Sequence, residues 1–127
     1  MSDSTGIDKW IEFAKNDLLV ARDLQLQKGY VYRAVLTHCQ QSAEKYLKAF
    51  LLMNLTGLHK THDLVFLNKK CNEFDSSFGS WNESLAWLSA IYIESRYPDD
   101  FEDIDKEDAM KALEIANGFE EFIKDKF

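Results

Sequence analysis

The chemistry that this sequence could perform is concentrated in one stretch, RAVLTHCQQSAEKYLKAFL, in which Arg33 precedes His38 by five residues. A histidine can move protons as a general acid or base, while an arginine can stabilise negative charge in a transition state. On a regular helix, however, residues five apart project about 140° from each other, and His38 falls in an apolar stripe. We therefore interpret His38 as a core histidine held by a buried hydrogen bond, with the Arg33–His38 pair as the alternative.

A polar stripe on the same segment supplies a second set of candidates. Arg33, Thr37, Gln41, Glu44 and Lys48 follow one another at spacings of four, four, three and four, so they share one helix face. This spacing favours a solvated surface with a Glu44–Lys48 pair that contributes roughly 0.3 kcal/mol. The alternative is a cleft that accepts a phosphate or a nucleotide. Its candidate lining residues are Gln41, Glu44, Lys45, Lys48, Arg96 and Tyr97.

Other patterns give little support to a metal centre or a cofactor. His59 and His62 stand three apart in HKTH with no paired Cys or His nearby, which is a weak zinc signal. Residues 99–108 hold seven acids and one Lys, and carboxylates are favoured there because a predicted helix begins at this point. The sequence lacks a Gly-rich phosphate loop, a Ser nucleophile elbow and a CxxC pair. We expect no metal and no cofactor, and whether the chain is an enzyme stays open.

Composition is typical of a single globular domain. The chain has 127 residues, of which 46% are hydrophobic and 29% charged, enough for one core. A net charge of -7 argues against general DNA binding, because non-specific phosphate binding needs clustered Lys and Arg. Cys39 and Cys71 fit a reducing compartment, and no apolar run is long enough to span a bilayer. We expect a cytoplasmic protein that does not associate with membranes.

Helical periodicity repeats along the whole chain, whereas the alternation typical of strands does not occur. We predict one domain over residues 1–127, with residues 1–6 flexible. Short connections between long helices favour an all-α, up-and-down antiparallel bundle with a four-helix-bundle-like core. The five predicted helices cover residues 7–28, 30–55, 62–74, 81–95 and 105–125.

Glycine, proline and threonine predict where these helices begin and end. Gly29 and Gly57 close the first two, Thr61 caps the start of the third, and Pro98 stops the fourth. Gly118 lies inside the fifth helix, where glycine is unfavourable by up to about 1 kcal/mol relative to alanine. Its presence predicts a close helix crossing at that point.

The same segments resemble a known family. RAVLTHCQQSAEKYLKAFL, followed by KTHDLVFL and later by IESRYPDD, is similar to the HEPN family (higher eukaryotes and prokaryotes nucleotide-binding), and the similarity begins in KNDLLVARDLQ. The resemblance implies a small stand-alone prokaryotic member with a helical bundle that dimerises. It also implies one of the family's roles: toxin, RNA-cleaving nuclease or partner of a small nucleotidyltransferase.

Nuclease members of this family carry an Arg and a His a few residues apart, in a later helix where two subunits meet. Arg33 and His38 match that spacing, but they lie in an earlier helix. Around the later location, Arg96 is followed by Tyr97, Pro98 and acids, with no His through Phe127. The resemblance therefore does not extend to a typical HEPN nuclease.

The leading hypothesis is a HEPN-like helical module, non-catalytic or weakly catalytic. It would act with nucleotides or RNA, or with a separately encoded minimal nucleotidyltransferase, as a component of a toxin–antitoxin pair. One alternative is a metal-independent RNA endonuclease toxin that uses Arg33 and His38, and another is a plain dimeric interaction scaffold. The expected homodimer also rests on an aromatic content of 13%, including Trp10, Trp81 and Trp87, which exceeds what one stripe per helix uses.

Overall fold

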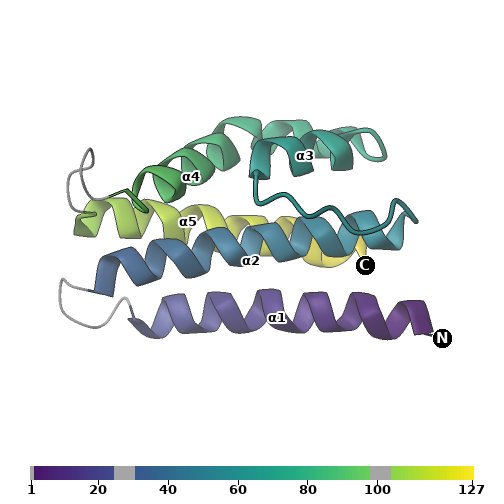
Figure 1. Cartoon of the computed structure of the whole chain (residues 1–127), viewed down its shortest axis with the longest axis horizontal. Helices are drawn as coiled ribbons and strands as arrows, with labels where there is room; N and C mark the ends of the chain where they lie inside the picture. Colours follow the sequence, from purple (N-terminus) through teal and green to yellow (C-terminus); the bar gives the residue numbers. More distant parts are fainter. Residues whose placement is uncertain (1, 25–30, 98–103) are drawn as a thin grey trace.

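The computed structural model describes residues 2–24, 31–97 and 104–127 (Figure 1). These ranges contain no strand, which confirms the predicted all-α class. The α-helices are α1 (Ser2–Leu24), α2 (Tyr32–Met53), α3 (Leu64–Asn72), α4 (Asn82–Glu94) and α5 (Lys106–Ile123). Two short 3-10 helices are η2 (Ser76–Trp81) and η3 (Lys124–Lys126). Within the described ranges, no helix combines the length and the apolar character that a membrane crossing needs.

Helix α2 is the central element of the bundle. It packs against α1 and α5, and also contacts α3 and α4 (Figure 1). The predicted antiparallel arrangement holds for α1 with α2 and for α4 with α5. Helix α3 instead runs in the same direction as α2, because the connection between them first returns along α2 (Figure 1). This returning connection, residues 54–63, covers part of the surface of α2.

Two of the predicted helix ends are corrected by the structure. Helix α2 ends at Met53, so Gly57, whose φ is +82°, lies in the connection and not at the helix end. Asp63, not Thr61, caps α3, and its carboxylate accepts hydrogen bonds from the backbone N–H groups two and three residues later. A carboxylate is well suited to this position because it satisfies two free donors at the positive end of the helix dipole.

At the other helix ends, α1 begins at Ser2, before the predicted start at residue 7. The predicted ends at Gly29 and Pro98 lie outside the described residues. Within the acidic run, Asp105 and Asp108 form a capping box at the start of α5. This arrangement agrees with the interpretation of those acids as charges that favour a helix N-terminus.

A closed group of rings, which we call the aromatic cluster, consists of Phe78, Trp81, Phe119 and Phe122. Phe78 and Phe119 are fully buried, and ring centroids lie 5.1 Å apart for Phe78–Phe122 and 5.3 Å for Trp81–Phe119. A Cβ atom at Gly118 would stand 3.0 Å from the indole of Trp81. Gly118 therefore has a close neighbour, but that neighbour is the side chain of Trp81, the last residue of η2, and not a crossing helix as the sequence predicted.

Candidate functional site

Charged and aromatic side chains gather along the line where α1 and α2 meet, which we call the α1–α2 seam. Helix α1 contributes a carboxylate and two aromatic rings, and α2 contributes a histidine and two lysines. The seam consists of Trp10, Phe13, Asp17, His38, Lys45 and Lys48.

Asp17 is the hydrogen-bond acceptor at the centre of the seam. It is 8% exposed, its Oδ1 lies 2.9 Å from Nδ1 of His38, and its Oδ2 accepts a hydrogen bond from Nζ of Lys45. These two partners compensate the carboxylate for lost hydration. His38 thus has the hydrogen bond that the sequence predicted, but its side chain is 31% exposed and lies at the seam, not in the apolar core.

Glu44 lies beside the seam and forms a second charged group with Lys48, and the structure buries both side chains. Their side chains are 8% and 6% exposed, and Lys48 donates a hydrogen bond of 2.9 Å to Glu44. His62 of the connection places Nδ1 2.9 Å from the same carboxylate oxygen, and Gln40 donates to the other oxygen at 3.2 Å. The predicted solvated face is wrong for this pair, because the returning connection and Trp10 lie over it.

Beside Lys45, the seam opens into a shallow hollow of about 340 Å³. Phe13 is 51% exposed in its wall, with Nζ of Lys45 5.8 Å from the ring centroid. Lys48 places Nζ 5.7 Å from the ring centroid of Trp10. Each ammonium group therefore has a favourable cation–π contact, and the surface of the hollow is mainly apolar. The residues that line it are Lys9, Trp10, Phe13 and Lys45.

Arg33 and His38 are not brought together within one chain. Both lie on the uninterrupted helix α2, so their side chains project about 140° apart. Arg33 is exposed in the first turn of α2, whereas His38 faces Asp17 of α1. Gln41, also on α2, is half-buried. A catalytic Arg–His pair would need an arginine from elsewhere.

Arg96 and Tyr97 also lie apart from Lys45 and Lys48, with which the sequence analysis placed them in one predicted cleft. Both are exposed just after α4, where the guanidinium of Arg96 lies 5.8 Å from the ring centroid of Tyr92. Helix α4 ends beside the start of α5, at the end of the bundle where α2 begins (Figure 1). Lys45 and Lys48 lie in the second half of α2. The predicted single cleft therefore does not form from these residues.

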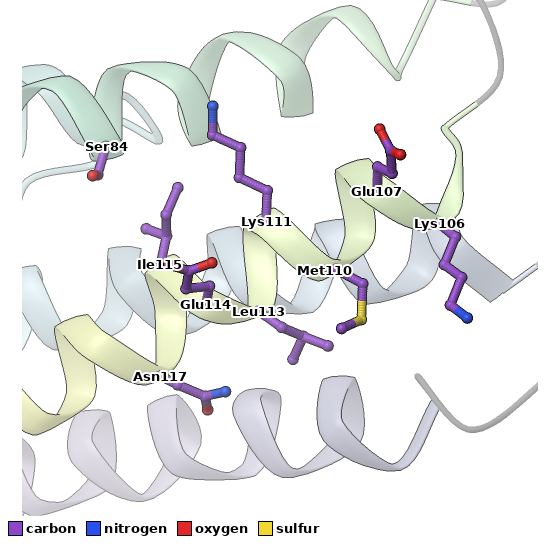
Figure 2. A pocket seen from close by; sticks show the side chains of 9 residues that line it. All are labelled: Ser84, Lys106, Glu107, Met110, Lys111, Leu113, Glu114, Ile115 and Asn117. Atoms are coloured by element: carbon purple, nitrogen blue, oxygen red, sulfur yellow. The ribbon is translucent and has the colours of Figure 1, made fainter.

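A larger hollow of about 750 Å³ follows the outer side of α5 (Figure 2). Lys111 reaches toward α4, whereas Leu113 and Asn117 point toward α1 (Figure 2). Nζ of Lys111 lies 4.4 Å from the ring centroid of Trp87, and Asn117 accepts a hydrogen bond of 2.8 Å from Arg22. These groups hold neighbouring helices together and do not converge on one point, so this hollow is a weaker candidate than the seam.

The buried nucleophilic groups of the chain are held in their protonated forms. Burial raises the pKa of the Cys39 and Cys71 thiols to about 12. Burial, together with a hydrogen bond of 2.6 Å to Glu120, also raises the pKa of Tyr46. Glu120 pairs in addition with Arg22 at 3.0 Å, so this polar group links α1, α2 and α5. Thiolate chemistry at neutral pH is not supported at either cysteine.

Asp17 and Phe13 are the seam residues that sequence reasoning missed. Asp17 stands next to Leu18 and three residues after Ala14, and these two apolar residues are four apart, the spacing that places them on one helix face. A carboxylate in that position needs a partner when the helix packs, which was the available signal. Phe13 gave no comparable signal, because an aromatic residue next to an apolar stripe is typical of a core.

The fold and the seam define an all-α bundle with a paired-charge surface between its first two helices. The model of the HEPN domain family matches residues 7–126, and the chain therefore belongs to that family, as the resemblance implied. The crystal structure of ST0689, an archaeal HEPN homologue, is similar to this chain with a TM-score of 0.75 and 22% identity. The similarity covers 94% of this chain and 96% of that one, and it supports the fold. No curated protein matches the chain.

Proposed function

We propose that this HEPN protein is a non-catalytic or weakly catalytic binding module of the cytoplasm. It acts with nucleotides or RNA, or with a separately encoded minimal nucleotidyltransferase, as part of a toxin–antitoxin pair. Membership of the HEPN domain family supports this class of function. One observation carries the choice of binding over catalysis: Arg33 and His38 project about 140° apart on the uninterrupted helix α2, so one chain does not bring them together.

The pairing of the lysines supports the same choice. A catalytic group must reach the reacting phosphate in the transition state with little reorganisation. Lys45 is bound to Asp17, and Lys48 to Glu44, and the side chains of the two acids are 11% and 8% exposed. Moving either lysine to a phosphate would take the ammonium partner away from a poorly hydrated carboxylate and leave only its histidine and amide contacts, which is unfavourable. Binding of a partner or of a flat ligand at the surface does not require that movement.

Co-expression with a small nucleotidyltransferase encoded by an adjacent gene tests this proposal. We expect a stable complex on size-exclusion chromatography with light scattering, and a homodimer when the HEPN protein is alone. In a toxin–antitoxin pair, expression of one component alone arrests growth and co-expression restores it. A protein that dimerises but binds no nucleotidyltransferase, RNA or nucleotide would contradict the proposal and would be a plain dimeric scaffold.

The second candidate function is a metal-independent RNA endonuclease that uses Arg33 and His38. The Asp17–His38 hydrogen bond favours it, because a carboxylate on Nδ1 orients the imidazole and leaves Nε2 available as a base. Arg33 would then come from the second subunit of a homodimer. Purified protein is incubated with RNA beside Arg33→Ala and His38→Ala variants. Cleavage that both variants retain in full would eliminate these residues as the catalytic groups.

A further inference from the structure

We infer that the hollow beside Lys45 is a stacking site for a nucleobase, which comes either from single-stranded RNA or from a free nucleotide. This inference rests on the nucleotide or RNA branch of the proposed function, and it adds a location and a type of contact. Its central residues, Trp10 and Phe13, are not among the nucleotide-binding residues predicted from the sequence. The supporting observation is the placement of two aromatic rings and two lysines around one apolar hollow.

The size and the exposure of the hollow suit one planar ring system. Ligand pockets span about 300 to 1,000 Å³, so a hollow of about 340 Å³ is at the small end of that range. Phe13 is 51% exposed, which leaves ring surface open to a ligand. Trp10 lies three residues earlier on the same side of α1. Every base has a π-face, so stacking on such rings tolerates any sequence.

Lys45 and Lys48 hold the two aromatic rings in place and contribute little to the binding of phosphate. The ammonium groups of Lys45 and Lys48 each lie near a ring and are neutralised by carboxylates of the same chain. Lys9 differs, because its side chain is 66% exposed and its carboxylate partner, Glu12, is 3.9 Å away. Stacking therefore supplies most of the binding, and Lys9 is placed to meet one phosphate of the ligand.

Helix α3 supplies a matched control for these contacts. Phe66 is 39% exposed, and Nζ of Lys70 lies 5.6 Å from its ring centroid. This pair reproduces the aromatic–lysine contact of Phe13 with Lys45, but both of its members belong to one helix and neither lines the hollow. A substitution of Phe66 therefore tests whether an exposed ring beside a lysine is sufficient for binding.

The experiment measures binding of a fluorescently labelled single-stranded RNA of eight nucleotides by anisotropy. The full chain is compared with Phe13→Leu, Phe13→Tyr and Phe66→Leu, each checked for folding by circular dichroism. We expect Phe13→Leu to raise the Kd about tenfold or more, because leucine keeps an apolar side chain but has no ring face. Phe13→Tyr and Phe66→Leu should bind as the unchanged protein does. If AMP displaces the labelled RNA, the ligand is a free nucleotide. If AMP does not displace it, the ligand is the RNA strand.

Salt dependence gives an independent readout. One phosphate contact predicts a slope of about -0.7 for the logarithm of the binding constant against the logarithm of salt concentration. A slope steeper than about -2 would show that several phosphates contribute to binding, and it would overturn the inference. RNA binding that is unchanged in Phe13→Leu would also overturn it, while leaving the proposed function intact. If the unchanged protein binds neither RNA nor AMP, the nucleotide branch of the proposed function fails as well, and only the nucleotidyltransferase branch remains.

Discussion

Helix α2 contacts its neighbours in two different ways. Toward η2 and α5 it meets the aromatic cluster, where Phe50 of α2 lies 4.6 Å from Phe78 between ring centroids, and Phe78 and Phe119 are fully buried. Toward α1 it meets the seam, where charged groups are paired and Phe13 is half exposed. Both contacts bury apolar residues of α2, but the ring of Phe13 in the seam is about half exposed, whereas Trp81 and Phe122 of the aromatic cluster are partly buried.

This difference separates residues that hold the fold from residues that can meet a ligand. Rings in the aromatic cluster stabilise the fold through burial and through edge-to-face contacts, and they have little surface left for a partner. Charged groups in the seam are unfavourable to bury unless they are paired, and the structure pairs them. The seam can therefore lose a surface ring with little loss of stability, whereas the cluster cannot.

Removing a ring from the aromatic cluster should have the largest effect on stability. Phe119→Ala deletes a fully buried side chain that contacts Phe78, Trp81 and Phe122. We expect the free energy of unfolding to fall by about 3 to 5 kcal/mol, from lost burial and from the cavity left behind. Urea denaturation followed by circular dichroism measures this loss. A decrease below about 1 kcal/mol, the size of an average substitution, would show that the cluster does not anchor the fold.

The next largest effect is expected from the buried pair beside the seam. Glu44→Ala leaves the Lys48 side chain, which is 6% exposed, without its carboxylate. We expect a loss of about 3 kcal/mol in the same denaturation experiment, because an unpaired charge stays buried. The control is the double variant Glu44→Leu with Lys48→Met, which should lie within about 1 kcal/mol of the unchanged protein. If the single and double variants lose the same free energy of unfolding, the effect comes from lost packing and not from an unpaired charge.

A smaller effect on stability is expected at Gly118 of α5, beside the aromatic cluster. Alanine at Gly118 would favour the helix by up to about 1 kcal/mol. Its Cβ would stand 3.0 Å from the Trp81 indole, and overpacking of this kind is unfavourable by about 1 to 3 kcal/mol. We expect Gly118→Ala to be less stable by about 1 kcal/mol in urea denaturation. Gly6→Ala is the control, since its Cβ meets nothing within 4 Å and should not destabilise the protein. A more stable Gly118→Ala variant would contradict tight packing here.

Much of the fold could be predicted from the sequence, because apolar residues at helical spacing indicate which faces are buried. The five α-helices and the all-α class followed from that pattern. Helix η2 was missed because Phe78, its buried residue, stands alone in the Ser- and Gly-rich stretch DSSFGS. The cap of α3 was misplaced because Thr61 and Asp63 are both common capping residues, and their spacing does not decide between them.

The candidate site was harder to predict, because its contacts join residues that are distant in the sequence. The spacing of Glu44 and Lys48 placed them on one face, but their burial depends on Trp10 and on the returning connection. The partner of His38 is Asp17, 21 residues away, on a different helix. Periodicity within α2 shows which side chains share a face, and it contains no information about which other element covers that face.

The smallest effect on stability is expected at the open ring of the seam. Phe13→Leu changes a side chain that is 51% exposed, so the free energy of unfolding should stay within about 0.5 kcal/mol of that of the unchanged protein. Phe119→Leu, the same substitution at a fully buried position, is the control and should be clearly destabilising. Urea denaturation of both variants compares the two regions directly. A loss of about 2 kcal/mol or more at Phe13 would make its ring a packing residue and remove the distinction between the seam and the aromatic cluster.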